Sequence, residues 1–232
     1  MKEDQALGSG SPAEAAWPRR NGHRPRWWTT PLPVPLSKRL LDLTVSVLSV
    51  GILWPIFALT YALIKLDSPG PVLLRQKRVG YGGRDFTYYK FRTMVHHTRP
   101  DLTGRLPDGD LRNSLLSPPG KDPKVTPIGW VLRTTTLDEL PQLFNVVKGD
   151  MSLVGPRPDM PEIVAHWPAE FQARHQVKPG MTGLAQVNGR SDLTHYDKLR
   201  YDLDYVRRHP PLRDIQILLK TLMVVLSKKG AR

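Results

Sequence analysis

The pattern of apolar and polar positions divides the chain into three parts. Residues 1–36 mix Gly, Ser, Pro, Ala and Arg without apolar periodicity, which is typical of a tail with little fixed structure. Residues 43–64 then form a run of 22 residues without a charge, long enough to cross a hydrocarbon core of about 30 Å. From Ser68 onward polar residues and turn signals return. We therefore expect a tail (1–36), a membrane helix (37–66) and a soluble domain (67–232).

The apolar run predicts a kinked membrane helix. Pro55 lies near its middle and is expected to kink the helix, because it removes the backbone hydrogen bond to Gly51. Cations flank the run on both sides: Lys38, Arg39, Lys65, Arg75, Lys77 and Arg78. Positive residues near membrane ends favour the cytoplasmic side, so both ends are expected there. These residues alone leave a re-entrant helix and a kinked spanning helix equally open.

The soluble part combines short strands with several helices. Strands are predicted at 72–74 and 86–91, and a Gly-, Pro- and Asp-rich loop at 99–124. Helices are predicted at 128–133, 137–148, 161–175, 196–206 and 215–226. The last of these suits either a helix lying in the membrane interface or a core helix. The fold class is α/β, mainly α with short strands, with a membrane-anchored helix.

The composition excludes cysteine chemistry and indicates an anionic partner, but it does not identify that partner. The chain has 232 residues, which allows one domain plus tails. It has no cysteine, which excludes disulfides, thiol nucleophiles and cysteine zinc sites. Its 34 Lys and Arg against 21 Asp and Glu give a net charge of +13. That charge suits a polyanionic partner, whether nucleic acid, an anionic membrane or a phosphorylated substrate.

Several basic residues lie inside tight turns framed by glycine and proline. They are Lys90, Arg92, Arg133, Arg157 and Arg190. Guanidinium groups bind phosphate bidentately and lysine neutralises it as a point charge, so these segments would make a diphosphate site if they converge. The alternative is that each is a solvated surface residue.

Asp138 and Glu139 form the most interesting acidic pair. Thr136 followed by Glu139 matches a capping box, and taken alone this pattern favours a structural role. Considered together with the cations and the membrane helix, the pair favours a Mg²⁺ site, because hard oxygen ligands select Mg²⁺. Aspartate is also a competent nucleophile toward phosphorus. The residues themselves therefore indicate phosphoryl transfer at a membrane surface.

Several motifs resemble those of a known family, the bacterial sugar transferases known as monotopic phosphoglycosyl transferases. The resemblance covers residues 37–226. The motifs are KRLLDL, SPGPV, QKRVG, YKFRTM, TPIGWVLRTTTLDELPQLFNVVKGDMSLVGPRPD, VKPGMTGLAQVNGR and YDLDYV.

The resemblance implies a transfer of hexose 1-phosphate from a UDP-sugar to a polyprenyl (undecaprenyl) phosphate, with release of UMP. Asp138 would attack the β-phosphorus through an aspartyl phosphosugar intermediate, and the Asp138–Glu139 pair would hold Mg²⁺, chiefly through Glu139. The basic positions implied around the nucleotide sugar are Lys90, Arg133, Arg157 and Arg190, with Arg92 as a neighbour. The product would begin the synthesis of an exopolysaccharide or another glycan.

The resemblance also implies a helix that re-enters the membrane at Pro55, although Trp54 stands where small relatives carry serine. The catalytic domain would lie on the cytoplasmic face of the bacterial inner membrane, with amphipathic helices in the interface. Expected partners are the UDP-sugar, the polyprenyl phosphate and membrane lipids, with no nucleic acid; a homodimer stays open. Two rival hypotheses are a membrane-tethered protein that binds nucleic acid or anionic lipid, and an inactive scaffold.

Overall fold

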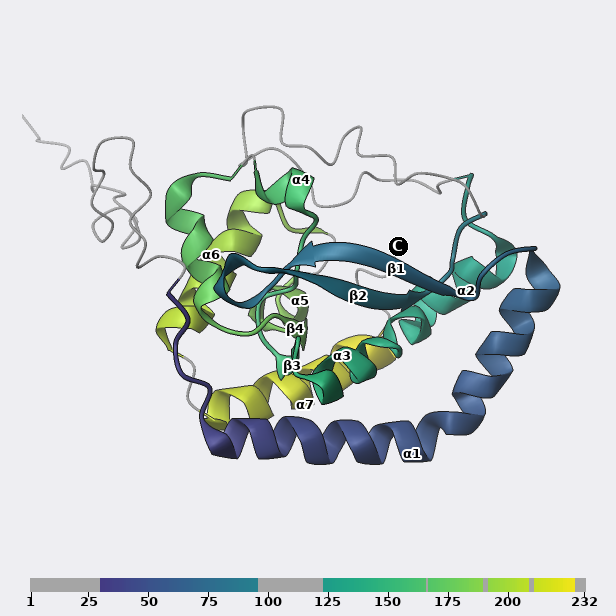
Figure 1. Ribbon diagram of the computed structural model, residues 1–232, viewed down its shortest axis with the longest axis horizontal. Helices are drawn as coiled ribbons and strands as arrows, with labels where there is room; N and C mark the ends of the chain where they lie inside the picture. Colours follow the sequence, from purple (N-terminus) through teal and green to yellow (C-terminus); the bar gives the residue numbers. More distant parts are fainter. Residues whose placement is uncertain (1–29, 96–122, 166, 190–191, 209–210, 228–232) are drawn as a thin grey trace, which may run out of the picture.

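The computed structural model describes residues 30–95, 123–165, 167–189, 192–208 and 211–227. Most of the predicted tail and of the predicted loop at 99–124 lie outside the described residues. The helices are α1 (Leu36–Asp67), α2 (Pro127–Thr135), α3 (Gln142–Lys148), α4 (Pro161–Val164), α5 (Leu184–Val187), α6 (His195–Arg207) and α7 (Pro211–Ser227). The strands are β1 (Leu73–Val79), β2 (Asp85–Phe91), β3 (Ser152–Val154) and β4 (Gly180–Thr182). The predicted class, mainly helical with short strands, is confirmed (Figure 1).

Two small sheets hold the soluble domain together. Strands β1 and β2 form an antiparallel hairpin in which Leu73 pairs with Phe91 and Val79 with Asp85. Strands β3 and β4 pair in parallel. The first strand is longer than predicted, because Arg75 and Lys77 are exposed along it and weaken the apolar signal that marks a strand.

The helix predicted at 161–175 is wrong as a single element. The structure has α4 over its first four residues and a 3₁₀ helix at Ala169–Gln176. Pro168 lies between them, and a proline disfavours helical backbone at the residue before it. The helix predicted at 137–148 is also divided, into a 3₁₀ turn at Leu137–Glu139 and α3, with Pro141 at the start of α3. The remaining predicted helices are present with slightly longer bounds.

Helix α1 is long, apolar and bent. It is the one helix of the described chain that is long and apolar enough to cross a membrane, and only 11% of its most apolar window is buried. Figure 1 shows the helix bending as it passes under and then beside the domain. Pro55 is the proline inside α1, and an internal proline is the usual cause of such a bend. The bend occurs although the preceding residue is an exposed tryptophan, Trp54.

Both ends of α1 are bound to the same soluble domain. At the N-terminal end, Lys38 Nζ lies 2.5 Å from Asp214 Oδ2 on α7. Asp42, which is buried, accepts hydrogen bonds from Ser152 Oγ and from the Leu153 backbone N–H, each at 3.0 Å. At the other end, Ile64 packs with Val72, Phe91 and Leu132. Both ends of the helix are therefore attached to one domain.

We expect Lys38→Met to destabilise the protein by about 3 kcal/mol, because it leaves Asp214 as an uncompensated buried charge. Adding Asp214→Leu should recover part of that loss. Lys65→Met, at the other end of α1 where Nζ makes one exposed bond of 3.3 Å to Gly70 O, is the matched control and should cost less than about 1 kcal/mol. Denaturant unfolding in detergent measures all three, and equal losses for the two lysine variants would contradict this assignment.

Candidate active site

The two candidate acids lie on a strained turn. Asp138 and Glu139 belong to the 3₁₀ turn that follows α2. Thr136, which joins the two elements, has φ 62°, and it is the one residue other than glycine with positive φ in the described chain. Such backbone costs a β-branched residue on the order of 1 to 2 kcal/mol. Surrounding contacts must therefore hold this turn in place.

Each acid is paired with a cation from a different part of the chain. Lys90 Nζ, on β2, lies 2.6 Å from Asp138 Oδ2. Arg157, in the segment after β3, forms a bidentate ion pair with Glu139, in which Nη1 lies 2.9 Å from Oε2 and Nη2 donates to Oε1. The side chain of Asp138 is only 4% exposed. The predicted convergence of Lys90 and Arg157 on the acidic pair is thus present in the structure.

The electrostatics of this cluster keep Glu139 ionised. Burial by itself raises the pKa of Glu139, but the charge and hydrogen bonds of Arg157, with smaller effects of Lys90 and Gln142, lower that pKa to about 2. Behind the acids, burial raises the pKa of Tyr88 well above its usual value. Tyr88 is therefore a neutral hydroxyl, and Gln142 Nε2 donates to it at 2.5 Å. The pattern in the sequence gave no sign of Tyr88 or Gln142, which are polar groups at otherwise apolar core positions.

The capping-box interpretation is wrong. The Thr136 side chain makes no capping hydrogen bond, and its left-handed backbone is not the extended conformation that capping requires. The Glu139 carboxylate instead accepts hydrogen bonds from Arg157.

The position of Arg157 depends on close packing between the backbone after β3 and the backbone of β4. The Gly155 N–H donates to Thr182 O at 2.9 Å, and the Gly180 N–H donates to Pro156 O at 3.0 Å. A Cβ on Gly155 would lie 2.3 Å from Lys178 O, and one on Gly180 would lie 2.1 Å from Gly155 N. Only glycine allows this approach, because no real Cβ contact is that short.

The other three predicted basic residues differ in position. Arg133 lies at the edge of the acidic turn, where its carbonyl accepts from the Thr136 N–H at 3.2 Å and its Nε donates to Thr93 Oγ1 at 3.1 Å. Arg92 is buried and faces the end of α1, where it donates to Pro69 O (2.8 Å), Ser68 O (2.6 Å), Ser68 Oγ (3.0 Å) and Ile64 O (3.3 Å). Arg190 lies outside the described residues.

The donor set suits a divalent cation that arrives with its substrate. No group of three or more His, Cys, Asp or Glu residues that could hold a metal occurs among the described residues, so the Asp138–Glu139 pair supplies two carboxylates at most. Mg²⁺ commonly binds through one or two carboxylates and completes its shell with phosphate oxygens and water.

The chain is similar to known proteins over most of its length. Residues 34–228 match the family model described as "Bacterial sugar transferase". The chain belongs to this family. A UDP-N-acetylgalactosamine-undecaprenyl-phosphate N-acetylgalactosaminephosphotransferase from Aeromonas hydrophila is 39% identical over 211 residues, which are 87% of this chain and 47% of that protein.

Two further relatives of this bacterial sugar transferase are named for different sugars. A UDP-glucose:undecaprenyl-phosphate glucose-1-phosphate transferase from Caulobacter vibrioides is 40% identical over 87% of this chain and 75% of that protein. An undecaprenyl-phosphate galactose phosphotransferase from Salmonella typhimurium is 39% identical over 84% of this chain and 41% of that protein. The chain thus spans less than half the length of two of these three relatives.

We expect Arg92→Met to destabilise the protein by about 3 kcal/mol, because four acceptors at the end of α1 lose the charged donor of a buried side chain. Arg75→Met, which removes an exposed cation from the same hairpin, should change stability by less than about 0.5 kcal/mol. Thermal unfolding compares the two. A stable Arg92→Met protein would mean that this guanidinium is available for substrate.

Proposed function

We propose that this protein is a phosphoglycosyl transferase that moves a hexose 1-phosphate from a UDP-sugar to a polyprenyl phosphate and so begins the synthesis of an exopolysaccharide or another glycan. The observation that carries the proposal is the buried Asp138 carboxylate, paired with Lys90 beside the Glu139–Arg157 ion pair. The names of the relatives, which include sugar phosphotransferases acting on undecaprenyl phosphate, support the substrate classes.

In the first step, an oxygen of the Asp138 carboxylate attacks the β-phosphorus of the UDP-sugar. The bond from that phosphorus to the bridging oxygen breaks, its electron pair stays on that oxygen, and UMP leaves. The sugar phosphate is then held on Asp138 as an acyl phosphate. Lys90 occupies one Asp138 oxygen in the free protein, so the incoming phosphate must draw its ammonium group away. That exchange frees the nucleophile only when a substrate is present.

In the second step, a phosphate oxygen of the polyprenyl phosphate attacks the same phosphorus. The bond to the Asp138 oxygen breaks, the carboxylate is restored, and the polyprenyl diphosphate sugar leaves. Division into two steps means that two bulky anions need not occupy the site together. Arg157 and Arg133 would stabilise the charge that develops on the phosphoryl oxygens.

Mg²⁺ fits this site as a partner of the diphosphate. Bound there, it would neutralise phosphate charge and polarise the phosphoryl oxygens. Glu139 and Asp138 are the carboxylates that would hold it. The depressed pKa of Glu139 keeps that carboxylate in the ionised form that a metal ligand needs.

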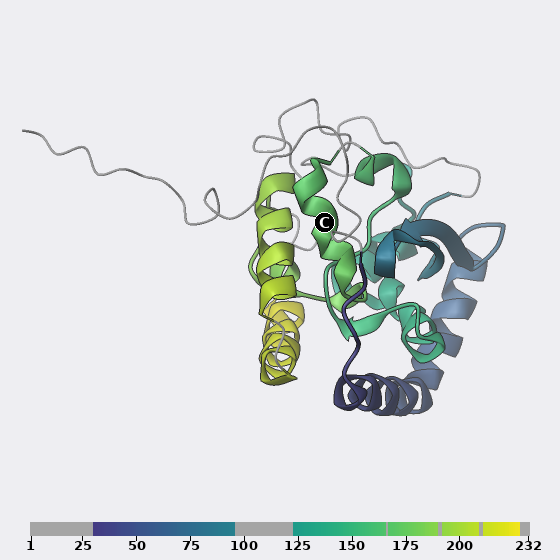
Figure 2. The ribbon, with the colours of Figure 1, turned by 60° about the vertical axis from the view of Figure 1, so that its left-hand side comes forward.

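We further propose that α1 is re-entrant and that the domain lies on the cytoplasmic face of the bacterial inner membrane. The support is the attachment of both helix ends to one domain. Figure 2 shows α7 at the same lower edge as the first part of α1. The exposed apolar residues of α7 are Leu212, Ile215, Leu219, Leu222 and Met223. An apolar face of this kind is typical of a helix lying in a membrane interface. The net charge of +13 then serves phosphorylated substrates and anionic lipids rather than nucleic acid.

We expect Asp138→Asn to lower UMP release by about 10³-fold or more, because the amide cannot act as the nucleophile. The assay uses protein reconstituted in membranes, a panel of UDP-sugars, Mg²⁺ or a chelator, and undecaprenyl phosphate present or absent. Asp85→Asn, which alters an exposed carboxylate on the same β2 strand, is the control and should retain activity.

Near-normal UMP release by Asp138→Asn would overturn the role of Asp138. Absence of UMP from every donor with folded wild-type protein would instead favour the scaffold, and salt-sensitive binding of polyanions without any use for Asp138 would favour the polyanion-binding hypothesis.

Topology can be tested separately because the chain has no native cysteine. Leu36 and Leu66 lie at opposite ends of α1 and are 73% and 84% exposed. We expect Leu36→Cys and Leu66→Cys to react with a membrane-impermeant thiol reagent from the same side in inverted vesicles. Reaction from opposite sides would show that the helix spans the bilayer.

A further inference from the structure

The segment that carries Arg157 is bonded at every carbonyl from residue 156 to 159, although it belongs to no helix or strand. Four different donors take part. The pairs are Gly180 N with Pro156 O (3.0 Å), Arg174 Nη2 with Arg157 O, Arg78 Nη1 with Pro158 O (3.3 Å) and Val79 N with Asp159 O (3.0 Å). The two prolines also fix φ. The direction in which Arg157 leaves the backbone is therefore set by these bonds.

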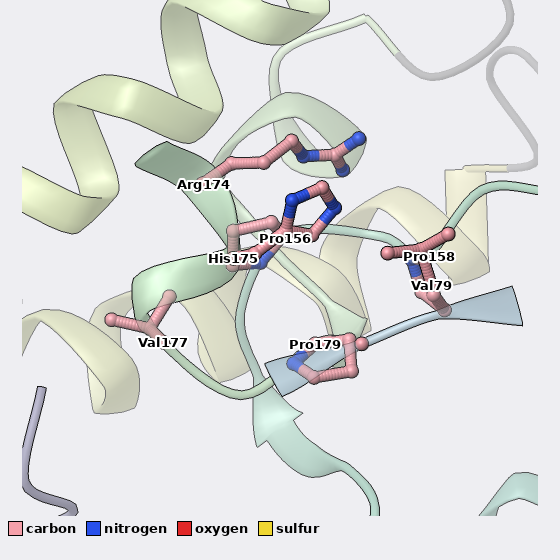
Figure 3. A pocket seen from close by; sticks show the side chains of 8 residues that line it. Val79, Pro156, Pro158, Arg174, His175, Val177 and Pro179 are labelled. Atoms are coloured by element: carbon pink, nitrogen blue, oxygen red, sulfur yellow. The ribbon is translucent and has the colours of Figure 1, made fainter. Parts of the chain in front are cut away.

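One of the donors, Arg174, also belongs to a buried cluster of charges. Its side chain is 2% exposed, and its Nη1 lies 2.9 Å from Asp159 Oδ2 and its Nη2 2.8 Å from Asp202 Oδ2. Its guanidinium carbon lies 4.6 Å from the centre of the Trp167 ring. Figure 3 shows Arg174 beside His175 at a small cleft that Pro156 and Pro158 also line. Arg174 thus joins the 3₁₀ helix Ala169–Gln176 to the segment that carries Arg157.

A second buried cation belongs to the same cluster but does not touch that backbone. Lys198, on α6, is bonded to the Asp159 carboxylate, and its Nζ lies 5.5 Å from the centre of the Trp167 ring. Lys198 bonds to none of the carbonyls of residues 156–159, whereas Arg174 bonds directly to Arg157 O. Buried ion pairs often add little net stability. The position of the cluster therefore suggests a role in holding the segment that carries Arg157.

We propose that Arg174 is a positioning residue for the sugar-phosphate transfer: by holding the Arg157 carbonyl, it directs the Arg157 guanidinium onto Glu139. This inference rests on the proposed function. Arg174 itself touches neither acid of the site. Its effect on turnover must pass entirely through Arg157, so it should vanish when Arg157 is absent.

A double-mutant cycle on kcat/KM for UMP release tests the proposal. We expect Arg174→Met to lower kcat/KM by about 10- to 100-fold in the wild-type background, because displacement of a positioned group by about 1 Å can have effects of that size. In the Arg157→Ala background, the same substitution should change kcat/KM by less than about 2-fold. Equal effects in the two backgrounds would overturn the proposal.

Lys198→Met is the matched control for loss of a buried cation. In each methionine variant Asp159 keeps one cation, because Arg174 and Lys198 both bind it. Loss of Arg174 leaves Asp202 without its partner, but burial already raises the pKa of Asp202 to about 6, so this carboxyl can take up a proton and the fold survives. We expect Lys198→Met to change kcat/KM by less than about 3-fold even where its stability loss equals that of Arg174→Met. A loss of turnover that follows stability in both variants would overturn the proposal.

Hydrogen exchange measured by mass spectrometry gives a readout that does not depend on activity. The amides of Val79 and Gly180, which donate to Asp159 O and Pro156 O, should exchange about 10-fold faster in Arg174→Met and at the wild-type rate in Lys198→Met. Arg174→Lys keeps the charge but loses the fork that reaches Arg157 O and both carboxylates, so it should restore stability without restoring turnover. Inactive wild-type protein would count against the proposed function. Unchanged exchange in Arg174→Met would count against the positioning role whether or not the wild-type protein is active.

Discussion

The site depends on the neutralisation of two adjacent, largely buried carboxylates by cations that come from distant parts of the chain. Asp138 is paired with Lys90 and Glu139 with Arg157, and without these partners two like charges on one turn would repel and would resist burial. Two parts of the soluble domain supply these cations. The β1–β2 hairpin presents Lys90, and the glycine contacts between β3 and β4 bring Arg157 to the opposite side of the turn.

Under the proposed function, the same pairing would change when a substrate arrives. Phosphate oxygens compete for the cations that hold the acids, so a diphosphate can release the carboxylates while it binds. In the proposed reaction, Lys90 and Arg157 neutralise the acids in the free protein, and Mg²⁺ bound with the diphosphate would take over that role. In the proposed arrangement, α1 would bring this exchange to the membrane, since both of its ends are attached to the same domain.

Much of this could be predicted from the sequence, for identifiable reasons. The long apolar helix, the turn residues and the acidic pair all leave local patterns. The structure brings Lys90 and Arg157 to the Asp138–Glu139 pair, although Lys90 lies on β2 rather than in the turn that the sequence predicts. Arg92 shares the motif of Lys90 but faces α1, since the backbone after β2 turns it toward Ser68 and Pro69. The division of residues 161–175 depends on Pro168. Arg174 and Lys198 could not be found, because a buried cation on a polar helix resembles a solvated one until its distant partners are known.

The covalent intermediate is the central claim, and mass spectrometry of the peptide that contains Asp138 tests it most directly. Wild-type protein would be incubated with its UDP-sugar and Mg²⁺ without lipid acceptor, then quenched and digested. The account predicts a hexose phosphate adduct on the peptide that contains Asp138, absent from Asp138→Asn and discharged when undecaprenyl phosphate is added. UMP release that requires the lipid acceptor, with no adduct at any time, would contradict the account and indicate direct transfer between the two substrates.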